Sequence, residues 1–268
     1  MSPTSTTEAP ASWTWPGAQQ AFDLSGRVAL VTGGSRGLGL AMVRGFARAG
    51  ADVAIASRKL EACEQAAGEV RSLGREALAH ACHVGDWDAL ERLVDAVYER
   101  FGRLDVLINN AGMSPIAPSS LETGEDLYDK VMAVNLKGPF RLTALVGSRM
   151  AAGDGGSIVN VSSTASIRPT PQTAPYAAAK AGLNAITVAY AHEYGPKVRV
   201  NCIMAGPFHT DVSRAWSRSE GFSELARRTF ALGRAGDPDE VVGAALYFAS
   251  DASRFTSGSV LRVDGGAP

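Results

Sequence analysis

The stretch VALVTGGSRGLG, residues 28–39, decides the fold. Five apolar or β-branched residues run directly into a segment with four glycines in seven positions. Glycine permits a tight turn and lets a pyrophosphate approach the backbone closely, and the helix predicted from Leu38 offers unpaired N–H groups and the positive end of its dipole. A flexible turn is the alternative interpretation. The position of this glycine-rich segment between a buried strand and an amphipathic helix favours a dinucleotide-binding site.

The rest of the chain repeats this strand-and-helix alternation. Apolar, β-branched runs typical of buried strands lie at Val28–Thr32, Val53–Ser57, Ala77–Cys82, Leu104–Asn109, Ile158–Ser162, Val198–Ile203 and Val260–Val263. Helical periodicity covers Leu38–Ala49, Leu60–Leu73, Asp88–Phe101, Ala177–Tyr194 and Asp239–Ala249. Strands buried on both faces and separated by helices indicate a parallel sheet covered on each side. We therefore predict an α/β fold, a Rossmann-type doubly wound parallel sheet of about seven strands in a single domain.

Composition narrows the class of protein. The 268 residues are 46% hydrophobic and 20% charged, with a net charge of −1, so nothing favours a nucleic-acid or acidic-membrane partner. No apolar run reaches the roughly 18 residues that span a bilayer. Three widely spaced cysteines without a CxxC pattern indicate free thiols in a reducing compartment. We expect a cytoplasmic protein, with no membrane partner and no metal site.

The N-terminus differs from the body in composition. Residues 1–22 are rich in Ser, Thr, Ala and Pro and lack the basic start and apolar middle of a secretory signal. We predict a flexible tail over 1–22 and a catalytic domain over 23–268. Trp13 and Trp15 are unusual in such a tail, and docking on the body or on a neighbouring subunit is one interpretation of them.

The end of the second strand bears on the choice of cofactor. An acidic residue there usually binds a free 2′-hydroxyl of the adenosine ribose, but this chain has Ser57-Arg58-Lys59. Arg36 in the glycine loop adds a second guanidinium. Two arginines suit a 2′-phosphate, so NADP(H) is favoured over NAD(H). The alternative is that Arg58 only begins the next helix and faces solvent.

Tyr176 and Lys180 occupy positions i and i+4 of a predicted helix. Residues at this spacing share a helix face, and an ammonium beside a phenol favours the phenolate, so the pKa of Tyr176 is expected to fall. Such a tyrosine exchanges a proton with a carbonyl or alcohol oxygen. A Tyr and a Lys at this spacing also occur on solvated helix faces, so the pattern needs the rest of the chain.

Further motifs accompany the glycine loop and the Tyr176–Lys180 pair along the chain: Asn109-Asn110-Ala111-Gly112, Asn135, Ser163, Gly206-Pro207 with Thr210, and Val263-Asp264-Gly265-Gly266. Taken in order, these motifs resemble the classical subfamily of short-chain dehydrogenases/reductases from about Leu24 to Gly266. The resemblance implies one Rossmann-type domain and a nicotinamide cofactor. It also implies a homotetramer in which helices near 130–150 and 177–194 pair across subunits.

Catalytic roles follow from the resemblance. Tyr176 would be the general acid/base, and Lys180 would lower its pKa and hydrogen-bond the nicotinamide ribose. Ser163 would hold the substrate oxygen, with its neighbour Ser162 as the alternative candidate, although alternation along a strand directs the two side chains differently. Asn135 would bind a water that links Lys180 to solvent.

Cofactor contacts are implied at a larger set of positions. Gly206 and Thr210 would fix the carboxamide, and Asn110 and Gly112 would border the adenosine, although an Asn-Gly step is also a simple turn. The cofactor-binding residues predicted in this way are Gly33, Ser35, Arg36, Leu38, Ser57, Arg58, His83, Val84, Asn110, Gly112, Tyr176, Lys180, Gly206, Pro207 and Thr210.

Two positions depart from the family pattern. His83-Val84 stands where an Asp-Val pair is usual, and that aspartate normally accepts from the adenine amino group. Either a ring nitrogen of His83 or the backbone of Val84 would replace it. Ala205-Gly206 replaces the usual Pro-Gly pair and keeps the glycine.

The substrate side is less specific. Residues 208–234 contain aromatic and arginine side chains, and in the family this region is a lid over the substrate. The residues that could line a pocket or face solvent on an amphipathic helix are Trp216, Phe222, Phe230, Arg214, Arg218, Arg227 and Arg228. Ile167, Arg168 and Pro169 are further candidates for the pocket border.

The sequence therefore predicts an NADP(H)-dependent oxidoreductase that interconverts a small-molecule ketone and a secondary alcohol by hydride transfer. A 3-oxoacyl-[acyl-carrier-protein] reductase-like enzyme, a sugar-acid or polyol dehydrogenase, and a carbonyl reductase of secondary metabolism remain open within that class. The alternative outside it is a non-catalytic NADP(H)-sensing regulator on the same fold.

Overall fold

The structure is a computed structural model that describes residues 14–211, 213, 217 and 219–268. Trp13, Arg214, Trp216 and Arg218, which the sequence analysis singled out, lie outside the described residues.

A seven-stranded parallel sheet forms the centre of the molecule, in the order β3-β2-β1-β4-β5-β6-β7. The strands are β1 (Val28–Thr32), β2 (Asp52–Ser57), β3 (Ala77–Ala81), β4 (Val106–Asn109), β5 (Gly156–Ser163), β6 (Val198–Ala205) and β7 (Val260–Val263). All six strand pairs run parallel. The Rossmann-type doubly wound fold predicted from the sequence is confirmed, and each of the seven predicted strands exists.

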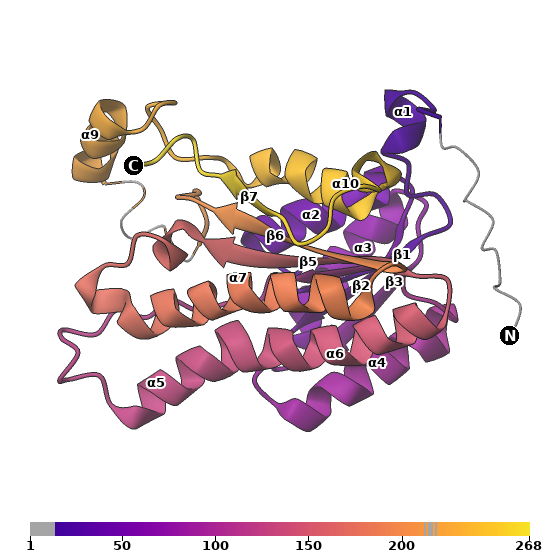
Figure 1. Cartoon of the computed structure of the whole chain (residues 1–268), viewed down its shortest axis with the longest axis horizontal. Helices are drawn as coiled ribbons and strands as arrows, with labels where there is room; N and C mark the ends of the chain where they lie inside the picture. The colour runs from indigo at the N-terminus through magenta and orange to yellow at the C-terminus, as the bar shows by residue number, and fades with distance from the viewer. Residues whose placement is uncertain (1–13, 212, 214–216, 218) are drawn as a thin grey trace, which may run out of the picture.

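Helices cover both faces of this sheet (Figure 1). One face carries α2 (Gly37–Arg48), α3 (Leu60–Ser72) and α10 (Val242–Ala249), and the other carries α4 (Trp87–Phe101), α6 (Gly138–Ala152) and α7 (Ala174–Tyr194). Two apolar cores result. Phe46 and Phe248 are buried in the first, and Leu93 and Leu142 in the second. Because β1 and β4 are buried on both faces, their sequences are continuously apolar rather than alternating.

Local signals explain where the helices begin and end. The Asp86 side chain accepts hydrogen bonds of 3.1 Å from the backbone N–H groups of Asp88 and Ala89, which caps α4. Gly102 ends the same helix in the left-handed conformation, at φ 72°.

The helical region after β4 is less regular than the single helix near 130–150 that the family resemblance implies. It consists of α5 (Glu125–Met132), the π-helical turn η1 (Ala133–Lys137) and α6. The predicted helix 239–249 likewise begins as a 3-10 turn, η4 (Pro238–Val241), with a capping box between Asp237 and Glu240.

The body also begins earlier than the predicted boundary. Instead of a flexible tail up to residue 22, the structure has a helical turn, α1 (Ala18–Ala21). Ala21 and Leu24 are fully buried, and Leu24 N–H donates to the Ala49 carbonyl at 2.8 Å. These contacts attach the segment to the end of α2.

Within the described ranges, the structure contains no helix with the length and apolar character needed to cross a membrane.

Candidate active site

The predicted site residues gather where the strands end. The chain winds outward from β1 to β3 and then returns to continue from β4 to β7 on the other side of β1. In open α/β sheets the crevice at this reversal, beyond the carboxyl ends of the strands, is where ligands bind. In Figure 1 the arrowheads of β5, β6 and β7 point to this edge, where α9 (Glu220–Thr229) and the C-terminus also lie.

The glycine loop is held rigidly against the loop after β4. Asn110 Nδ2 donates to the carbonyl oxygens of Thr32 and Gly33, at 2.9 and 3.3 Å. A Cβ on Gly39 would lie 2.2 Å from the Gly33 carbonyl oxygen, and Gly37 has φ +55°. The loop therefore requires glycine at these positions, and the geometry fits a phosphate-binding turn at the start of α2. Asn110 shapes this loop, which is a more specific role than the adenosine wall that the sequence implied.

The ends of the first two strands meet beside this loop. Ser35 Oγ donates to Ser57 Oγ at 2.9 Å, which links the glycine loop to the end of β2. Arg36 and Arg58 are exposed on either side of this contact. Among the described residues, neither guanidinium forms an ion pair with a carboxylate. Two arginines without acidic partners fit a bound phosphate group.

His83 follows β3 and already uses one ring nitrogen. Its Nδ1 accepts from the Gly85 backbone N–H at 3.2 Å. A neutral imidazole with an accepting Nδ1 carries its proton on Nε2, which then donates rather than accepts. Such a ring cannot accept from an adenine amino group, so the geometry favours the second sequence-based alternative, the backbone of Val84.

Tyr176 and Lys180 lie on the first turns of α7, as predicted. Lys180 is only 4% exposed, and its Nζ donates to the Val161 carbonyl at 2.8 Å. The same Nζ lies 5.8 Å from the centroid of the Tyr176 ring. Burial lowers the pKa of Lys180 to about 8, and the nearby Cys202 opposes this change.

The predicted fall in the pKa of Tyr176 is wrong for this arrangement. Burial of the phenol raises the pKa of Tyr176, and hydrogen bonding by the Ser163 hydroxyl opposes the rise. The i, i+4 argument considered only the neighbouring ammonium. Desolvation of the phenol has the larger effect on its pKa, although Tyr176 as a whole is only partly buried, and the Lys180 ammonium turns toward a backbone carbonyl.

Ser163 and Ser162 point in different directions, which distinguishes the two candidates. The buried Ser162 donates to the Lys180 carbonyl at 3.1 Å and so stabilises α7 against β5. Ser163 is at the end of β5, where its hydroxyl interacts with Tyr176 and accepts from the Ala165 N–H at 3.2 Å. The structure thus brings the Ser163 and Tyr176 hydroxyls together.

Asn135 lies in the π-helical turn η1 and is fully buried. Its amide donates to the carbonyls of Met113 and Val131, at 2.8 and 2.9 Å, and accepts from the Met113 N–H at 3.2 Å. A Cβ on Gly112 would lie 3.0 Å from Asn135 Oδ1 and 3.6 Å from Lys180 Nζ. Asn135, Gly112 and Lys180 are therefore neighbours, and both amide donors of Asn135 are already used.

The segment after β6 closes the opposite wall of the site. A Cβ on Gly37 would lie 3.5 Å from Thr210 Cγ2, so Thr210 packs against the start of α2. The Gly206 N–H donates to the Val263 carbonyl at 2.9 Å, and Pro207 accepts from Gly236 N–H at 3.0 Å. Residues 206–210 are thereby held next to the glycine loop, as a cofactor-binding segment requires.

The described part of the predicted lid shows how its aromatic residues pack. The Phe222 and Phe230 rings meet edge to face, with centroids 5.9 Å apart. Arg227 on α9 pairs with Glu224 at 2.7 Å, and Arg228 is exposed. Arg227 therefore belongs to the solvated face of an amphipathic helix, one of the two interpretations that the sequence allowed.

Behind the site lies a buried network of hydrogen-bonded polar side chains that was not predicted from the sequence. Asn109 Nδ2 donates to Asn160 Oδ1, and Asn160 Nδ2 donates to Thr187 Oγ1, both at 2.9 Å. These hydrogen bonds join β4 and β5 to α7, the helix that carries Tyr176 and Lys180. The only signal of this network in the sequence was polar residues inside otherwise apolar runs.

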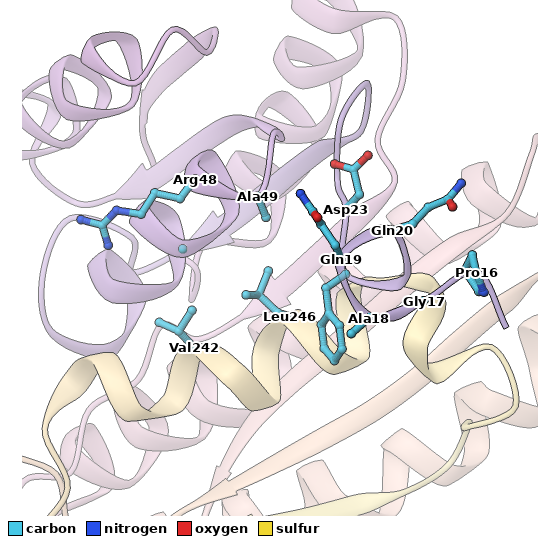
Figure 2. Close-up of a pocket in the computed structure, with 12 residues that line it drawn as sticks. Pro16, Gly17, Ala18, Gln19, Gln20, Asp23, Arg48, Ala49, Val242 and Leu246 are labelled. Carbon is cyan, nitrogen blue, oxygen red and sulfur yellow. The ribbon is translucent and has the colours of Figure 1, made fainter.

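A surface cleft lies at the other end of the sheet. Figure 2 shows Ala18, Gln19, Arg48, Val242 and Leu246 around it, from α1, α2 and α10. None of the residues predicted to act in catalysis or cofactor binding lines this cleft. The hydroxyl, lysine and glycine-loop groups converge at the carboxyl edge instead, which makes that edge the candidate active site.

Comparisons with known proteins cover nearly the whole chain. A family model described as enoyl-(acyl carrier protein) reductase matches residues 33–268. A 2-dehydro-3-deoxy-D-gluconate 5-dehydrogenase of Pseudoalteromonas atlantica is 38% identical over 248 residues, covering 91% of this chain and 97% of the relative. A 3-oxoacyl-[acyl-carrier-protein] reductase FabG of Thermotoga maritima is 37% identical, covering 91% of this chain and 98% of the relative.

A solved structure agrees with these sequence matches. The crystal structure of a gluconate 5-dehydrogenase from Burkholderia cenocepacia, in complex with NADP and tartrate, has a TM-score of 0.88 and 35% identity, covering 93% of this chain and 98% of the other. Motif order, sheet topology and relatives at this identity agree along one continuous alignment. The chain belongs to the short-chain dehydrogenase/reductase family and is an oxidoreductase that uses a nicotinamide cofactor.

Proposed function

We propose that this protein is an NADP(H)-dependent oxidoreductase that interconverts a ketone and a secondary alcohol, with Tyr176 as the general acid/base. The observation that carries the proposal is the meeting of the Tyr176 and Ser163 hydroxyls at the carboxyl edge, beside a buried Lys180 and the glycine loop. A bound nicotinamide supplies or accepts the hydride.

The side chains of this site suit the charge that develops during reduction. Two hydroxyl groups facing one oxygen donate hydrogen bonds to it as negative charge grows there. A raised pKa keeps the Tyr176 phenol protonated near neutral pH, which is the form that gives a proton to a carbonyl oxygen. Ser163 would hold the oxygen in place, and Lys180 would bind the nicotinamide ribose.

The side-chain N–H groups of Asn135 would not hold the water that was expected to link Lys180 to solvent. Both N–H donors of its amide are used by backbone carbonyls. Water bound near Lys180 would therefore be held by backbone oxygens of the π-helical turn η1 rather than by the donors of this amide. The side chain keeps η1 against residues 112–113.

The cofactor preference rests on Arg36 and Arg58. Both are exposed beside the Ser35–Ser57 contact, and no carboxylate stands at the end of β2 to bind a ribose 2′-hydroxyl. The NADP in the structure of the Burkholderia cenocepacia relative supports the same choice. We infer NADP(H) rather than NAD(H).

Two substrate classes have support from the relatives. A 3-oxoacyl thioester corresponds to the Thermotoga maritima relative, and a keto-sugar acid to the gluconate-type dehydrogenases. The non-catalytic sensor alternative would not need the complete set of Ser163, Tyr176 and Lys180, so the intact set favours the enzyme.

A homotetramer is the proposed assembly. The outward side of α7 presents Ala181, Ala185, Val188 and Ala189 to solvent in the single chain, and Phe140 on α6 is 43% exposed. An apolar strip of this kind on two adjacent helices is typical of a surface that another subunit covers.

The test is oxidation of NADPH, and in parallel NADH, against acetoacetyl-CoA, 5-keto-D-gluconate, a cyclic ketone and an aryl ketone. We expect turnover of at least one ketone class with NADPH, and a loss of roughly a hundredfold or more in kcat for Tyr176→Phe. Tyr190→Phe, a buried tyrosine on the same helix, is the matched control. Turnover by Tyr176→Phe at the wild-type rate would disprove the acid/base assignment, and tight NADPH binding without turnover of any ketone would favour the sensor.

A further inference from the structure

The last residues of the chain form a tight turn against the active-site edge. We define the C-terminal segment as residues 264–267, which directly follow β7. Gly265 and Gly266 adopt φ values of +64° and +68°, and the Ala267 N–H donates to the Asp264 carbonyl at 3.1 Å. Left-handed glycines in succession fold the segment back on itself, so its carbonyl groups point toward neighbouring loops.

The base of the lid is attached to this segment. Leu232 N–H donates to the Gly265 carbonyl at 3.0 Å, and Ala231 N–H donates to the Gly266 carbonyl at 3.3 Å. A Cβ on Gly266 would lie only 2.5 Å from Ala231 Cβ, so the two backbones are in close contact. The residues that follow α9 therefore move with the C-terminal segment.

The turn that carries Ser163 is attached to the same segment from the other side. Arg168 Nη1 donates to the Ala267 carbonyl at 2.9 Å, and Arg168 N–H donates to the Thr164 carbonyl at 2.9 Å. Ser166 Oγ donates to the Ser163 carbonyl at 2.6 Å. Residues 163–168 thus form one hydrogen-bonded turn, and the Arg168 guanidinium extends from it to the C-terminal segment.

The guanidinium has no competing ion pair. Among the residues that the structure describes, no carboxylate lies within ion-pair distance of Arg168. Its guanidinium donates to the Ala267 carbonyl, which also accepts a hydrogen bond of 3.0 Å from Arg262 Nη2. The contact spans 99 positions of sequence. A charged donor committed to one backbone carbonyl fixes geometry, since arginine presents its N–H groups in a planar, directional fork.

We propose that Arg168 is a positioning residue that couples the lid to the catalytic serine through the C-terminal segment. The inference rests on the proposed function and adds a specific path to it. The path runs from Ser163 through Arg168 and Ala267 to Gly266 and the lid base at Ala231. The lid base and the turn that carries Ser163 are then held in one relative position.

Steady-state kinetics with NADPH and either acetoacetyl-CoA or 5-keto-D-gluconate test the coupling. Arg168→Ala is expected to raise KM for the ketone about tenfold, the effect of losing one charge-assisted hydrogen bond. The kcat should fall several-fold as well, because the turn that carries Ser163 loses a support. The NADPH dissociation constant should change less than about twofold, because the glycine loop is not attached to Arg168. Arg168→Lys keeps a charged donor, so its KM should lie between those of the wild type and Arg168→Ala.

A second variant tests the path itself. Gly266→Ala breaks the next contact along it and should raise KM similarly, and the double variant should be little worse than either single one, since both cut the same connection. Gly74→Ala, with φ +76° and no atom within 4 Å of the added Cβ, controls for backbone strain. Arg100→Ala, which removes a surface pair with Glu76, controls for loss of an arginine. Additive effects, or an unchanged KM in a folded Arg168→Ala variant, would overturn the proposal.

Limited trypsin digestion tests the same coupling without depending on ketone reduction. Cleavage after Arg227 and Arg228 on α9, followed by mass spectrometry, should be several-fold faster in Arg168→Ala than in Arg100→Ala, because the C-terminal segment that holds the lid base then keeps only the Arg262 guanidinium at its Ala267 carbonyl. Equal cleavage rates would disprove the coupling. Failure of the wild-type protein to reduce any ketone, with faster cleavage still present in Arg168→Ala, would instead disprove the proposed function and leave the coupling standing.

Discussion

At the scale of single residues, Lys180 carries the largest electrostatic cost in the site. Its ammonium is almost completely buried and donates a hydrogen bond to the Val161 carbonyl. Removing a charge from water is unfavourable unless the partners replace its hydration. The lowered pKa of about 8 reports that imbalance. A residue that destabilises the folded chain and sits beside Tyr176 fits a functional role better than a structural one.

The first prediction concerns pH and stability. The pKa of Lys180 falls from 10.5 to about 8 on folding, so between these values the unfolded chain binds more protons than the folded chain. The free energy of unfolding therefore rises with pH across this window, by up to about 3 kcal/mol from this group, and the destabilisation is fully present below pH 8. Urea unfolding of wild type and Lys180→Met from pH 7 to 10 measures the difference.

Lys180→Met should lack this rise, so the stability difference between the two proteins should change steadily above pH 8. Lys197→Met is the matched control, because Lys197 also donates to a backbone carbonyl, that of Gly153 at 3.0 Å, but is exposed. A pH-independent difference between wild type and Lys180→Met would contradict the lowered pKa.

The second prediction concerns the two arginines beside the glycine loop. Removing Arg36 and Arg58 together should raise the NADPH dissociation constant by roughly a hundredfold or more, since each of the two charge-assisted contacts to a phosphate contributes about 1.5–3 kcal/mol. The NADH dissociation constant should hardly change. Fluorescence titration with both cofactors gives the two constants, and Arg71→Ala, a surface arginine paired with Glu64, serves as the control. Equal losses for NADPH and NADH would refute the 2′-phosphate assignment.

At the scale of elements, the start of α2 depends on an unusually close approach of two backbones. Gly39 lies on the first turn of α2, and a Cβ there would lie 2.2 Å from the Gly33 carbonyl oxygen and 2.6 Å from Asn110 Nδ2. Asn110 uses that same Nδ2 to hold the loop. The Asn110 side chain, which follows β4, therefore fixes the position of the glycine loop and of the first turn of α2.

The third prediction follows from this contact. Gly39→Ala should destabilise the fold by about 1–3 kcal/mol, because backbone atoms cannot move aside as a flexible side chain can, and should weaken binding of NADPH. Gly68→Ala, in the exposed middle of α3 with no atom within 4 Å of the added Cβ, should instead stabilise by up to about 1 kcal/mol through helix propensity. Thermal unfolding and NADPH titration of both variants provide the comparison. A neutral Gly39→Ala would show that the close approach is not required.

At the scale of the whole molecule, the helices on one face present two different environments. The inward side of α7 packs Leu183 and Tyr190 into the core, while its outward side carries small apolar residues in the single chain. Phe140, on the adjacent α6, stacks on Trp87, and both rings are about two-fifths exposed. Burying such a surface against another copy is favourable by roughly 25 cal/mol per Å².

The fourth prediction is the assembly that this surface forms. Light scattering should give four times the 27.9 kDa of one chain, about 112 kDa. Val188→Glu places a charge in the middle of the outward side of α7 and should shift the mass to smaller species, while Leu73→Glu, at the end of α3, should not. A monomeric wild-type mass would contradict the proposed tetramer.

Part of this molecule follows from local sequence alone. Hydrophobic periodicity predicts the order of strands and helices. The glycine loop and the Tyr176–Lys180 spacing are local patterns that directly indicate a tight turn and a shared helix face. Even the opposite directions of Ser162 and Ser163 follow from the alternation along a strand. These features were predictable because each depends on residues within a few positions of one another.

The remaining features required the tertiary structure, because they depend on packing between distant parts of the chain or on backbone geometry that hydrophobic periodicity does not determine. Burial of Tyr176 reverses the expected shift of its pKa, and burial is a property of the packed molecule rather than of a helix turn. The π-helical turn at Asn135, the engagement of His83 by Gly85 and the folded start at α1 depend on packing or local geometry that periodicity does not encode. The contact of Arg168 with Ala267 spans 99 positions, and only folding brings an arginine and a carbonyl at that separation together.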